Sequence, residues 1–398
     1  MAGSSSARLV QLSAAGALAY CSYAMCRSPV LPLFARQLGA SPAVVGTIVA
    51  ASTLTGVVLK FPAGAVSDVV GRRAVLLAGA VVFAVLPWSY VAIAALGTLA
   101  VARVVHGSAT ALFGPVASAT LSDLAPPDQR GRWLSVYAAA QGAGQAIGPV
   151  LAASLIVSND FSGAFVVSAV LGTQAIMLLI GWPRSAGRAT GHALWPQLRR
   201  GIRAVAADVR VLITSLAQAG QFFVNGTLSA FLPLYARESL DLSAPRIGWL
   251  FGMQTVATLC ARPVFGALSD RIGRRPLIVA GLTICAACMA AIGRAREFSA
   301  LLALTMVYGA GLALTTSATS AYVTDLSRRT QYGAAHGLFG TIYDIGDALG
   351  PICAGLLVAR AGYALAFQLT GAVALAVAAL FGWVSRHWEG PVDPSAAA

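Results

Sequence analysis

The chain has 398 residues, of which 58% are hydrophobic and only 10% charged, and its mean hydropathy is +0.76. Soluble domains carry about 25% charged residues, so the composition excludes a water-soluble globular protein. The formal net charge of +13 comes from charges that lie between apolar stretches. We therefore interpret these charges as loops beside a membrane and expect no nucleic-acid partner.

Twelve apolar runs follow one another along the chain, separated by short polar breaks. Most are close to the roughly 20 residues that a helix needs to cross a bilayer. The sequence thus predicts an all-α integral membrane protein of twelve spans. The runs cover residues 9–34, 43–66, 74–95, 97–121, 133–157, 161–183, 209–235, 246–268, 277–293, 299–323, 333–358 and 364–384.

An arginine-rich segment over 184–208 separates the first six runs from the last six. We interpret it as a cytoplasmic linker between an N-terminal half, 1–183, and a C-terminal half, 209–398, that ends in a short cytoplasmic tail. Linker arginines with interspersed apolar residues also suit an amphipathic helix at the membrane surface.

The arginines are unevenly distributed between the two sets of loops. If both termini are cytoplasmic, the outer set is only Arg36, Arg237, Arg246, Arg294, Arg296 and Arg360. Because Lys and Arg accumulate in cytoplasmic loops, we expect both termini inside. The alanine- and arginine-rich composition with a single lysine suggests a bacterial inner membrane.

A repeat relates the two halves of the chain. Gly64-Ala-Val-Ser-Asp-Val-Val-Gly-Arg-Arg73 returns as Gly266-Ala-Leu-Ser-Asp-Arg-Ile-Gly-Arg-Arg275, an offset of 266 − 64 = 202. Residues 31–36 also recur at 232–237, so we expect the first run to be a structural element that the mature protein keeps. Two pseudo-symmetric six-helix halves in the same orientation are implied, as in transporters whose site lies between parallel repeats.

The repeated loop resembles the signature loop of the major facilitator superfamily, and the resemblance extends over essentially the whole chain. It implies the major facilitator fold and a cytoplasmic latch that breaks as the two halves rock. In the first copy Val69 stands where the family often has arginine. The gating residues that the resemblance implies are Gly64, Asp68, Gly71, Arg72 and Arg73, and Gly266, Asp270, Arg271, Gly273, Arg274 and Arg275.

Two further motifs are similar to those of the superfamily's twelve-helix drug/proton antiporters. Arg103-Val-Val-His-Gly107 resembles an arginine motif of proton-coupled members, and Gly144-Gln-Ala-Ile-Gly148-Pro149 resembles a glycine–proline motif. Ala152-Ala153 replaces the motif's usual closing glycine pair. We expect these glycines and Pro149, with Gly350 and Pro351 in the second half, to pack helices closely.

Charged side chains within the runs are candidates for function, because a charge near the bilayer centre costs at least about 2.5 kcal/mol. Asp344 and Asp347 are three residues apart on one face of a helix. Two close carboxylates resist being ionised together. We therefore expect these two to couple transport to protons, and the resemblance to proton-coupled members of the superfamily implies the same role for Arg103. Alternatively, they pair with Arg27 or Arg103 and only hold the protein shut.

Other polar residues within the runs are candidates for binding a solute. Lys60 and Arg262 are 202 residues apart, which favours a structural role for both, with snorkelling to the cytoplasm. The uncharged residues could instead hydrogen-bond between helices. The substrate-binding candidates are Arg27, Lys60, Gln141, Gln145, Gln221, Asn225 and Tyr343.

These observations predict a monomeric transporter, with a small organic solute, protons and the lipid bilayer as partners. The most favoured function is proton-coupled efflux of a drug or metabolite by alternating access. An organic-anion transporter or exchanger that uses Arg27, Lys60 and Arg103 is the alternative. We expect no cofactor and no metal, since the four histidines and the Cys285–Cys288 pair complete no ligand set. A receptor or an intramembrane enzyme is disfavoured, because neither a sensor domain nor a nucleophile–base set is present.

Overall fold

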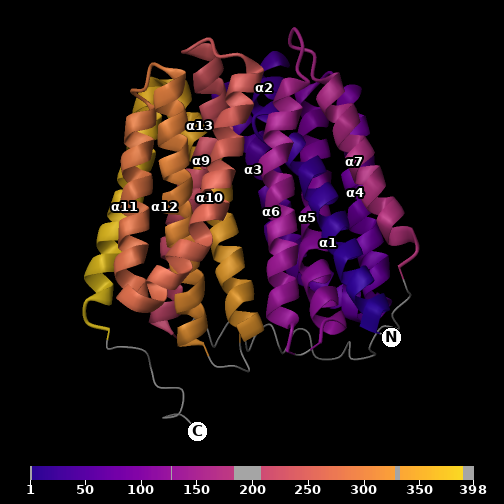
Figure 1. Ribbon diagram of the computed structural model, residues 1–398. Coiled ribbons are helices and arrows are strands. Elements are labelled where there is room, and N and C mark those ends of the chain that lie inside the picture. Colours follow the sequence, from indigo (N-terminus) through magenta and orange to yellow (C-terminus); the bar gives the residue numbers. More distant parts are fainter. Residues whose placement is uncertain (1, 127, 183–207, 328–331, 389–398) are drawn as a thin grey trace. The chain divides into compact units, whose positions relative to one another are not determined.

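The computed structural model describes residues 2–126, 128–182, 208–327 and 332–388, and these parts are helical apart from short connections and one isolated bridge (Figure 1). The helices of the first half are α1 (Ala2–Met25), α2 (Val30–Gln37), α3 (Pro42–Val70), α4 (Arg72–Val91), α5 (Leu96–Leu124), α6 (Arg130–Ser154) and α7 (Ser162–Ile180). Those of the second half are α9 (Val209–Glu238), α10 (Ala244–Ile272), α11 (Arg274–Ile292), α12 (Phe298–Leu326) and α13 (Tyr332–Ser385).

The predicted runs match these helices one by one, with two differences. The first run is interrupted at 26–29, so it forms α1 and α2 rather than one helix. Pro29 contributes to the break, because proline lacks an amide hydrogen and disfavours helical conformation in the residue before it. In the other direction, α13 contains the last two runs, which are separated at Gly362, where φ is +78°. The all-helical architecture expected from the sequence is confirmed.

Eight of the described helical segments are long and apolar enough to cross a membrane. They include α4, α7 and α11, each of 19 or 20 residues. Many apolar side chains are also exposed on the surface of the described helices, such as those of Val58 and Met177. Exposed apolar surface of this kind suits contact with lipid.

Glycine allows two very short connections at equivalent places in the repeat. α3 ends at Val70 and α4 begins at Arg72, and only Gly71 lies between them, with φ +94°. Gly273, with φ +98°, does the same between α10 and α11. A residue with a side chain is strained at such angles, whereas glycine is not. The repeated glycines thus start the helices that carry the arginine pairs of the signature loops.

Contacts divide the chain into two compact units. Unit 1 contains Met1–His192 and Pro233–Thr255, and unit 2 contains Ala193–Leu232 and Val256–Ala398. Within unit 1, α1 packs against α6, α3 against α5, and α4 against α7; within unit 2, α11 packs against α12 and α13. The predicted halves remain a prediction, and all of the proposed linker except Asp208 lies outside the described residues.

The repeat extends to the packing of single glycines. In unit 1, Cβ atoms added to Gly144 and Gly148 of α6 would meet the backbone of α1 at Ala17 and Cys21. In unit 2, Cβ atoms added to the glycines of α13 at 346 and 350 would meet α9 at 219 and 223. All four positions in unit 2 are 202 residues beyond their counterparts in unit 1. Each half therefore holds two of its helices together by the same close contact, as small residues do in membrane proteins.

Replacing Gly350 by valine is expected to destabilise the fold strongly. A Cβ atom there would collide with the carbonyl oxygen of Phe223 and lie 3.1 Å from the amide nitrogen of Thr227. Overpacking of this kind costs about 1–3 kcal/mol, and backbone atoms cannot yield as flexible side chains do. Thermal unfolding in detergent measures the loss. Gly337→Val is the control, because an added Cβ at Gly337 on the same helix has no atom within 4 Å. Equal loss of stability in both variants would contradict the prediction.

Candidate functional site

Two buried carboxylates lie on α13 within unit 2. Asp344 is 7% exposed and Asp347 is 6% exposed. Asn225 of α9 donates a hydrogen bond from Nδ2 to Oδ1 of Asp347 over 3.2 Å. The close approach of α9 to α13 makes this contact possible, because Gly346 next to Asp347 lies against the backbone of Ala219. The structure thus brings together two of the predicted residues, Asn225 and Asp347.

Further polar side chains continue along α9. Gln221, one turn before Asn225, donates from Nε2 to the Tyr308 hydroxyl and to the Cys285 Sγ atom, each over 3.3 Å. Its Oε1 atom is buried and accepts no hydrogen bond from the described residues. A buried acceptor without a donor is costly, so Gln221 is suited to receive a hydrogen bond from a solute or a water molecule. Unit 2 therefore contains two buried carboxylates and a Gln221 side chain whose Oε1 atom can still accept a hydrogen bond.

Tyr343 is half-buried on α13, next to Asp344. Its ring centroid lies 4.5 Å from that of Phe222 and 5.5 Å from that of Phe339. These three rings form an aromatic group that includes a phenol. Aromatic faces favour apolar and cationic groups of a ligand.

Arg103 of α5 is fully buried in unit 1 and is held by neutral groups. Its Nη2 atom donates to the Ser52 hydroxyl over 2.6 Å, and its Nη1 atom donates to the Cys26 carbonyl oxygen over 3.4 Å. Its Cζ atom lies 5.7 Å from the centroid of the Tyr23 ring. No carboxylate pairs with it in the described part of the chain, and its Nε atom is buried without an acceptor there.

The interruption between α1 and α2 supplies one of the Arg103 contacts. Cys26 follows the last residue of α1, and its carbonyl oxygen accepts from Arg103. Arg27 lies in the same interruption and is half-buried. The two halves differ in length here. Met25 and Thr227 make equivalent glycine contacts and are 202 residues apart, whereas Leu31 and Leu232, which begin the repeated segments, are 201 apart. The first half therefore has one extra residue at the place that carries Arg27.

His106 extends the buried group around Arg103. Its Nδ1 atom lies 2.9 Å from the Tyr90 hydroxyl, its ring meets that of Tyr23 edge-on at 5.0 Å, and its Nε2 atom is buried with no described partner. His106, Tyr90 and Ser52 were not predicted as site residues from the sequence. The spacing of His106 from Arg103, three residues on one helix, is the signal that places it on the same face.

The remaining substrate-binding candidates are dispersed. Lys60 is half-buried on α3, Gln141 is half-buried on α6, and Gln145 is exposed on α6. No hydrogen bond between these residues and Arg103 is present in the described structure. The structure therefore gathers Gln221, Asn225, Tyr343 and the acids in unit 2, and places Arg103 in a separate cluster in unit 1.

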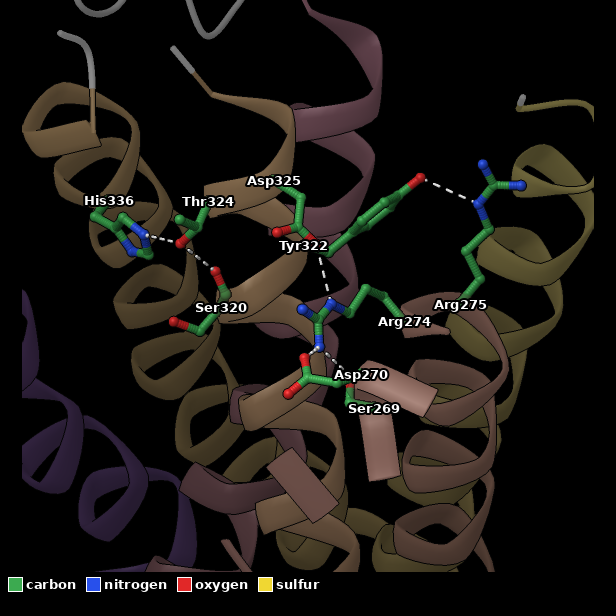
Figure 2. A network of polar contacts seen from close by, with 9 residues as sticks. All are labelled: Ser269, Asp270, Arg274, Arg275, Ser320, Tyr322, Thr324, Asp325 and His336. Carbon is green, nitrogen blue, oxygen red and sulfur yellow. Dashed lines mark hydrogen bonds and ion pairs between the residues drawn. The ribbon is translucent and has the colours of Figure 1, made fainter. Parts of the chain in front are cut away.

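The signature loops form matching polar networks. Arg72 donates to the Ser67 hydroxyl over 2.7 Å, and its Nε atom lies 3.3 Å from Oδ2 of Asp123 at the end of α5. Arg274 makes the same two contacts 202 residues later, to Ser269 and Asp325, each over 3.0 Å, and also pairs with Asp270 (Figure 2).

The second arginine of each pair contacts the last helix of its half. Arg73 donates to the carbonyl oxygen of Ile180, and Arg275 donates to that of Ser385. Arg275 also donates to the Tyr322 hydroxyl (Figure 2). The described contacts of both loops therefore connect helices of one half. Asp123 and Asp325 are also 202 residues apart, but neither was predicted as an arginine partner from the sequence.

Four of the other predicted gating residues give less information. The surroundings of Gly64 and the side chain of Asp68 lie outside what the structure describes. An added Cβ at Gly266 has no atom within 4 Å, so no close helix approach requires glycine there. Arg271 is exposed.

Arg274→Gln is expected to lower stability by about 1 kcal/mol, because it removes ion pairs to Asp270 and Asp325 that are partly exposed to solvent. Thermal unfolding of the purified protein measures the effect. Arg271→Gln, three residues earlier on an exposed side chain, is the control and should leave unfolding unchanged. A similar decrease in both variants would show that the loss comes from general charge and not from the network.

Comparison with known families gives a match over nearly the whole chain. The model of the Major Facilitator Superfamily matches residues 12–243 and 214–397. An uncharacterized MFS-type transporter of Methanocaldococcus jannaschii is 20% identical over 365 residues, covering 88% of this chain and 91% of that protein. The quinolone resistance protein NorA of Staphylococcus aureus is 22% identical over 341 residues, covering 83% and 84%. The multidrug resistance protein MdtH of Salmonella newport is 25% identical over 289 residues, covering 70% of each chain.

Solved structures show the same fold. A mutant of the nucleoside transporter NupG superposes with a TM-score of 0.81 at 12% identity, covering 94% of this chain and 98% of that chain. A bacterial homolog of the human lysosomal transporter Spinster, inward-facing and unoccupied, gives a TM-score of 0.80 at 17% identity and covers 96% of each chain.

Proposed function

The chain belongs to the major facilitator superfamily of membrane transporters, and we propose that it exports a small organic, drug-like solute in exchange for protons. The observation that carries the proposal is the pair of buried acids on α13, Asp344 and Asp347. Within apolar spans, ionisable groups mark ion and proton paths. Drug-resistance proteins among the relatives, NorA and MdtH, favour export of a drug-like compound.

Each residue of the unit 2 cluster has a role in this proposal. Asp344 and Asp347 exchange protons, because buried ionisable groups within apolar spans mark ion and proton paths. Asn225 holds Asp347 through its amide, and Gln221 offers its unused Oε1 acceptor to the solute. Tyr343 and its neighbouring rings receive the apolar part of the solute. The positive charge of Arg103 responds electrostatically when Asp344 and Asp347 gain or lose a proton during the transport cycle.

The arginine-containing cluster of unit 1 favours a second candidate, transport or exchange of an organic anion. A buried cation held only by neutral acceptors is electrostatically incomplete, and an anionic solute would supply its counter-charge. Arg27 in the α1–α2 interruption and Lys60 on α3 would add positive charge in this case. Loss of anion transport, but not of neutral-compound export, in Arg27→Ala would favour this candidate.

We also propose a membrane location, a topology and an oligomeric state for the transporter. The positive-inside distribution of arginine supports a multi-pass protein of a bacterial inner membrane with both termini in the cytoplasm. The loop networks around Arg72 and Arg274 stabilise the cytoplasmic ends of the helices and gate them during transport. We propose a monomer as the working unit, because each half repeats the same helix packing within one chain.

Proton movement in proteoliposomes tests the proposal. Candidate lipophilic drugs are added to vesicles that contain wild type, Asp344→Asn or Asp347→Asn, and a pH-sensitive dye reports the proton flux. Substrate-driven proton flux that is lost in either variant supports antiport with coupling on α13. Flux that survives in both variants would move coupling elsewhere, and solute transport without proton flux would favour the anion exchanger.

A further inference from the structure

One ion pair joins the two repeats within unit 1. Arg36 of α2 donates from Nε to Oε1 of Glu238 over 2.7 Å, and Glu238 is the last residue of α9. The two side chains are 36% and 34% exposed. Arg36 also donates from Nη1 to the carbonyl oxygen of Ala40 over 2.8 Å, which fixes its direction. This pair is therefore oriented, yet still in contact with water.

A contact of small residues in the same unit accompanies the ion pair. Cβ atoms added to Gly248 and Gly252 of α10 would meet the end of α6. The nearest atoms at Gly248 are the Ala153 Cβ atom at 2.5 Å and the Pro149 carbonyl oxygen at 2.8 Å, and Gly252 meets the side chain of Val150. The two glycines leave room for the small apolar side chains of Ala153 and Val150 against α10. No polar side chain of the described residues takes part in these contacts, so the helices can separate here without leaving a buried polar side chain unpaired.

Both contacts lie near helix ends that the predicted topology places on one side of the membrane. Arg36 and Glu238 are at the C-terminal ends of α2 and α9, Val150 and Ala153 are near the C-terminal end of α6, and Gly248 is near the N-terminal end of α10. In the topology that the arginine distribution predicts, all of these ends face the outside. The ion pair and the glycine contact then occupy one level of the membrane.

We infer that Arg36 and Glu238 are positioning residues that hold the outer side closed, and that they separate, together with α6 and α10, each time the site opens outward. The inference rests on the proposed transport function. A partly exposed ion pair is weak enough to break in every cycle, since such pairs contribute about 0.2–1 kcal/mol. A deeply buried pair would hold one state too strongly for substrate or protons to shift the populations.

Arg237 gives a matched control. It occupies the place of Arg36 in the repeated segment 232–237, and its Nη1 atom also donates to a backbone carbonyl, that of Leu242, over 3.3 Å. Its carboxylate partner is the exposed Asp241, one turn further along the chain, at 3.8 Å. This local pair does not hold two separate helices together, because Arg237 and Asp241 are four residues apart and move together.

Thiol labelling from the outside tests the inference. Val150→Cys is introduced after Cys260 and Cys353, the two natural cysteines with exposed side chains, are replaced by serine. Right-side-out vesicles are then treated with a membrane-impermeant maleimide. We expect Arg36→Ala and Glu238→Ala to raise the labelling rate by up to about fivefold, the change that corresponds to the upper end of the strength of such a pair. The charge exchange Arg36→Glu with Glu238→Arg should restore the slow rate, and Arg237→Ala should leave it unchanged.

Two outcomes would overturn the inference. Either single variant could label at the wild-type rate, or the charge exchange could label as fast as the single variants, which would show that the pair itself does not matter. Because labelling requires no solute, it gives an answer even if the wild-type protein moves none of the drugs tested. Failure of the proposed function appears instead in the proteoliposome assay, so the two results are separate.

Discussion

Asp347→Asn is expected to abolish proton-linked export while leaving the protein folded and able to bind its solute. Asparagine has nearly the same shape, but its neutral amide cannot release a proton. The rate of uphill export should fall by about 100-fold or more, because the coupling proton has lost its carrier. Solute accumulation in inverted membrane vesicles under an imposed pH gradient measures this loss, and equilibrium binding in detergent measures the retained affinity.

Asp241→Asn is the control for this experiment, since Asp241 is an acid whose side chain is 98% exposed. It should export at the wild-type rate. If Asp347→Asn also loses solute binding and thermal stability, the residue has a structural role and the proton-coupling assignment is wrong. If Asp344→Asn alone loses coupling, the proton is carried by Asp344 and not by Asp347.

Arg103→Met is expected to separate stability from transport. Methionine fills much of the same volume and removes a cation that is buried without a carboxylate partner, so the gain from avoiding desolvation offsets the loss of two hydrogen bonds. We expect the free energy of unfolding to change by no more than about 1 kcal/mol. Transport should nevertheless fall by about 100-fold, because a charge within the spans has a functional role.

The measurements for this prediction are thermal unfolding and transport on the same preparation. Arg262→Met serves as the control, since Arg262 is an exposed arginine on α10 whose repeat position suggests a structural role. A marked loss of stability with Arg103→Met would show that the guanidinium mainly holds Ser52 and Cys26 in place. Selective loss of anion transport would support the organic-anion exchanger.

The periodicity and the repeat predicted most of the fold. All twelve apolar runs correspond to described helices, and the 202-residue offset holds for the glycine contacts at Gly148 and Gly350 as well as for the loop arginines. An apolar run reflects the average hydropathy of about 20 consecutive residues, so it identifies a membrane-spanning segment well. It does not detect a local interruption, and for this reason the break at 26–29 was missed.

Partners across helices were the harder part of the site. The sequence placed Asp347 and Asn225 in different runs, and only the packing of α9 on α13 brings them to hydrogen-bonding distance. The partners of Arg103, such as Ser52, are ordinary residues with no signal of their own. Hydrogen-bond geometry depends on the rotation of each helix about its axis, which an apolar run of unknown orientation does not define.

The glycine register of the two halves separates the scaffold of this protein from its chemistry. The glycines of the helix contacts are the same in both halves, whereas the polar residues differ. Arg103 corresponds to Thr305, and Asp347 corresponds to Gln145. Substitutions at such polar positions would leave the helix contacts intact. A single mutation at either position is therefore expected to impair transport while the helix packing shared by the two repeats is kept.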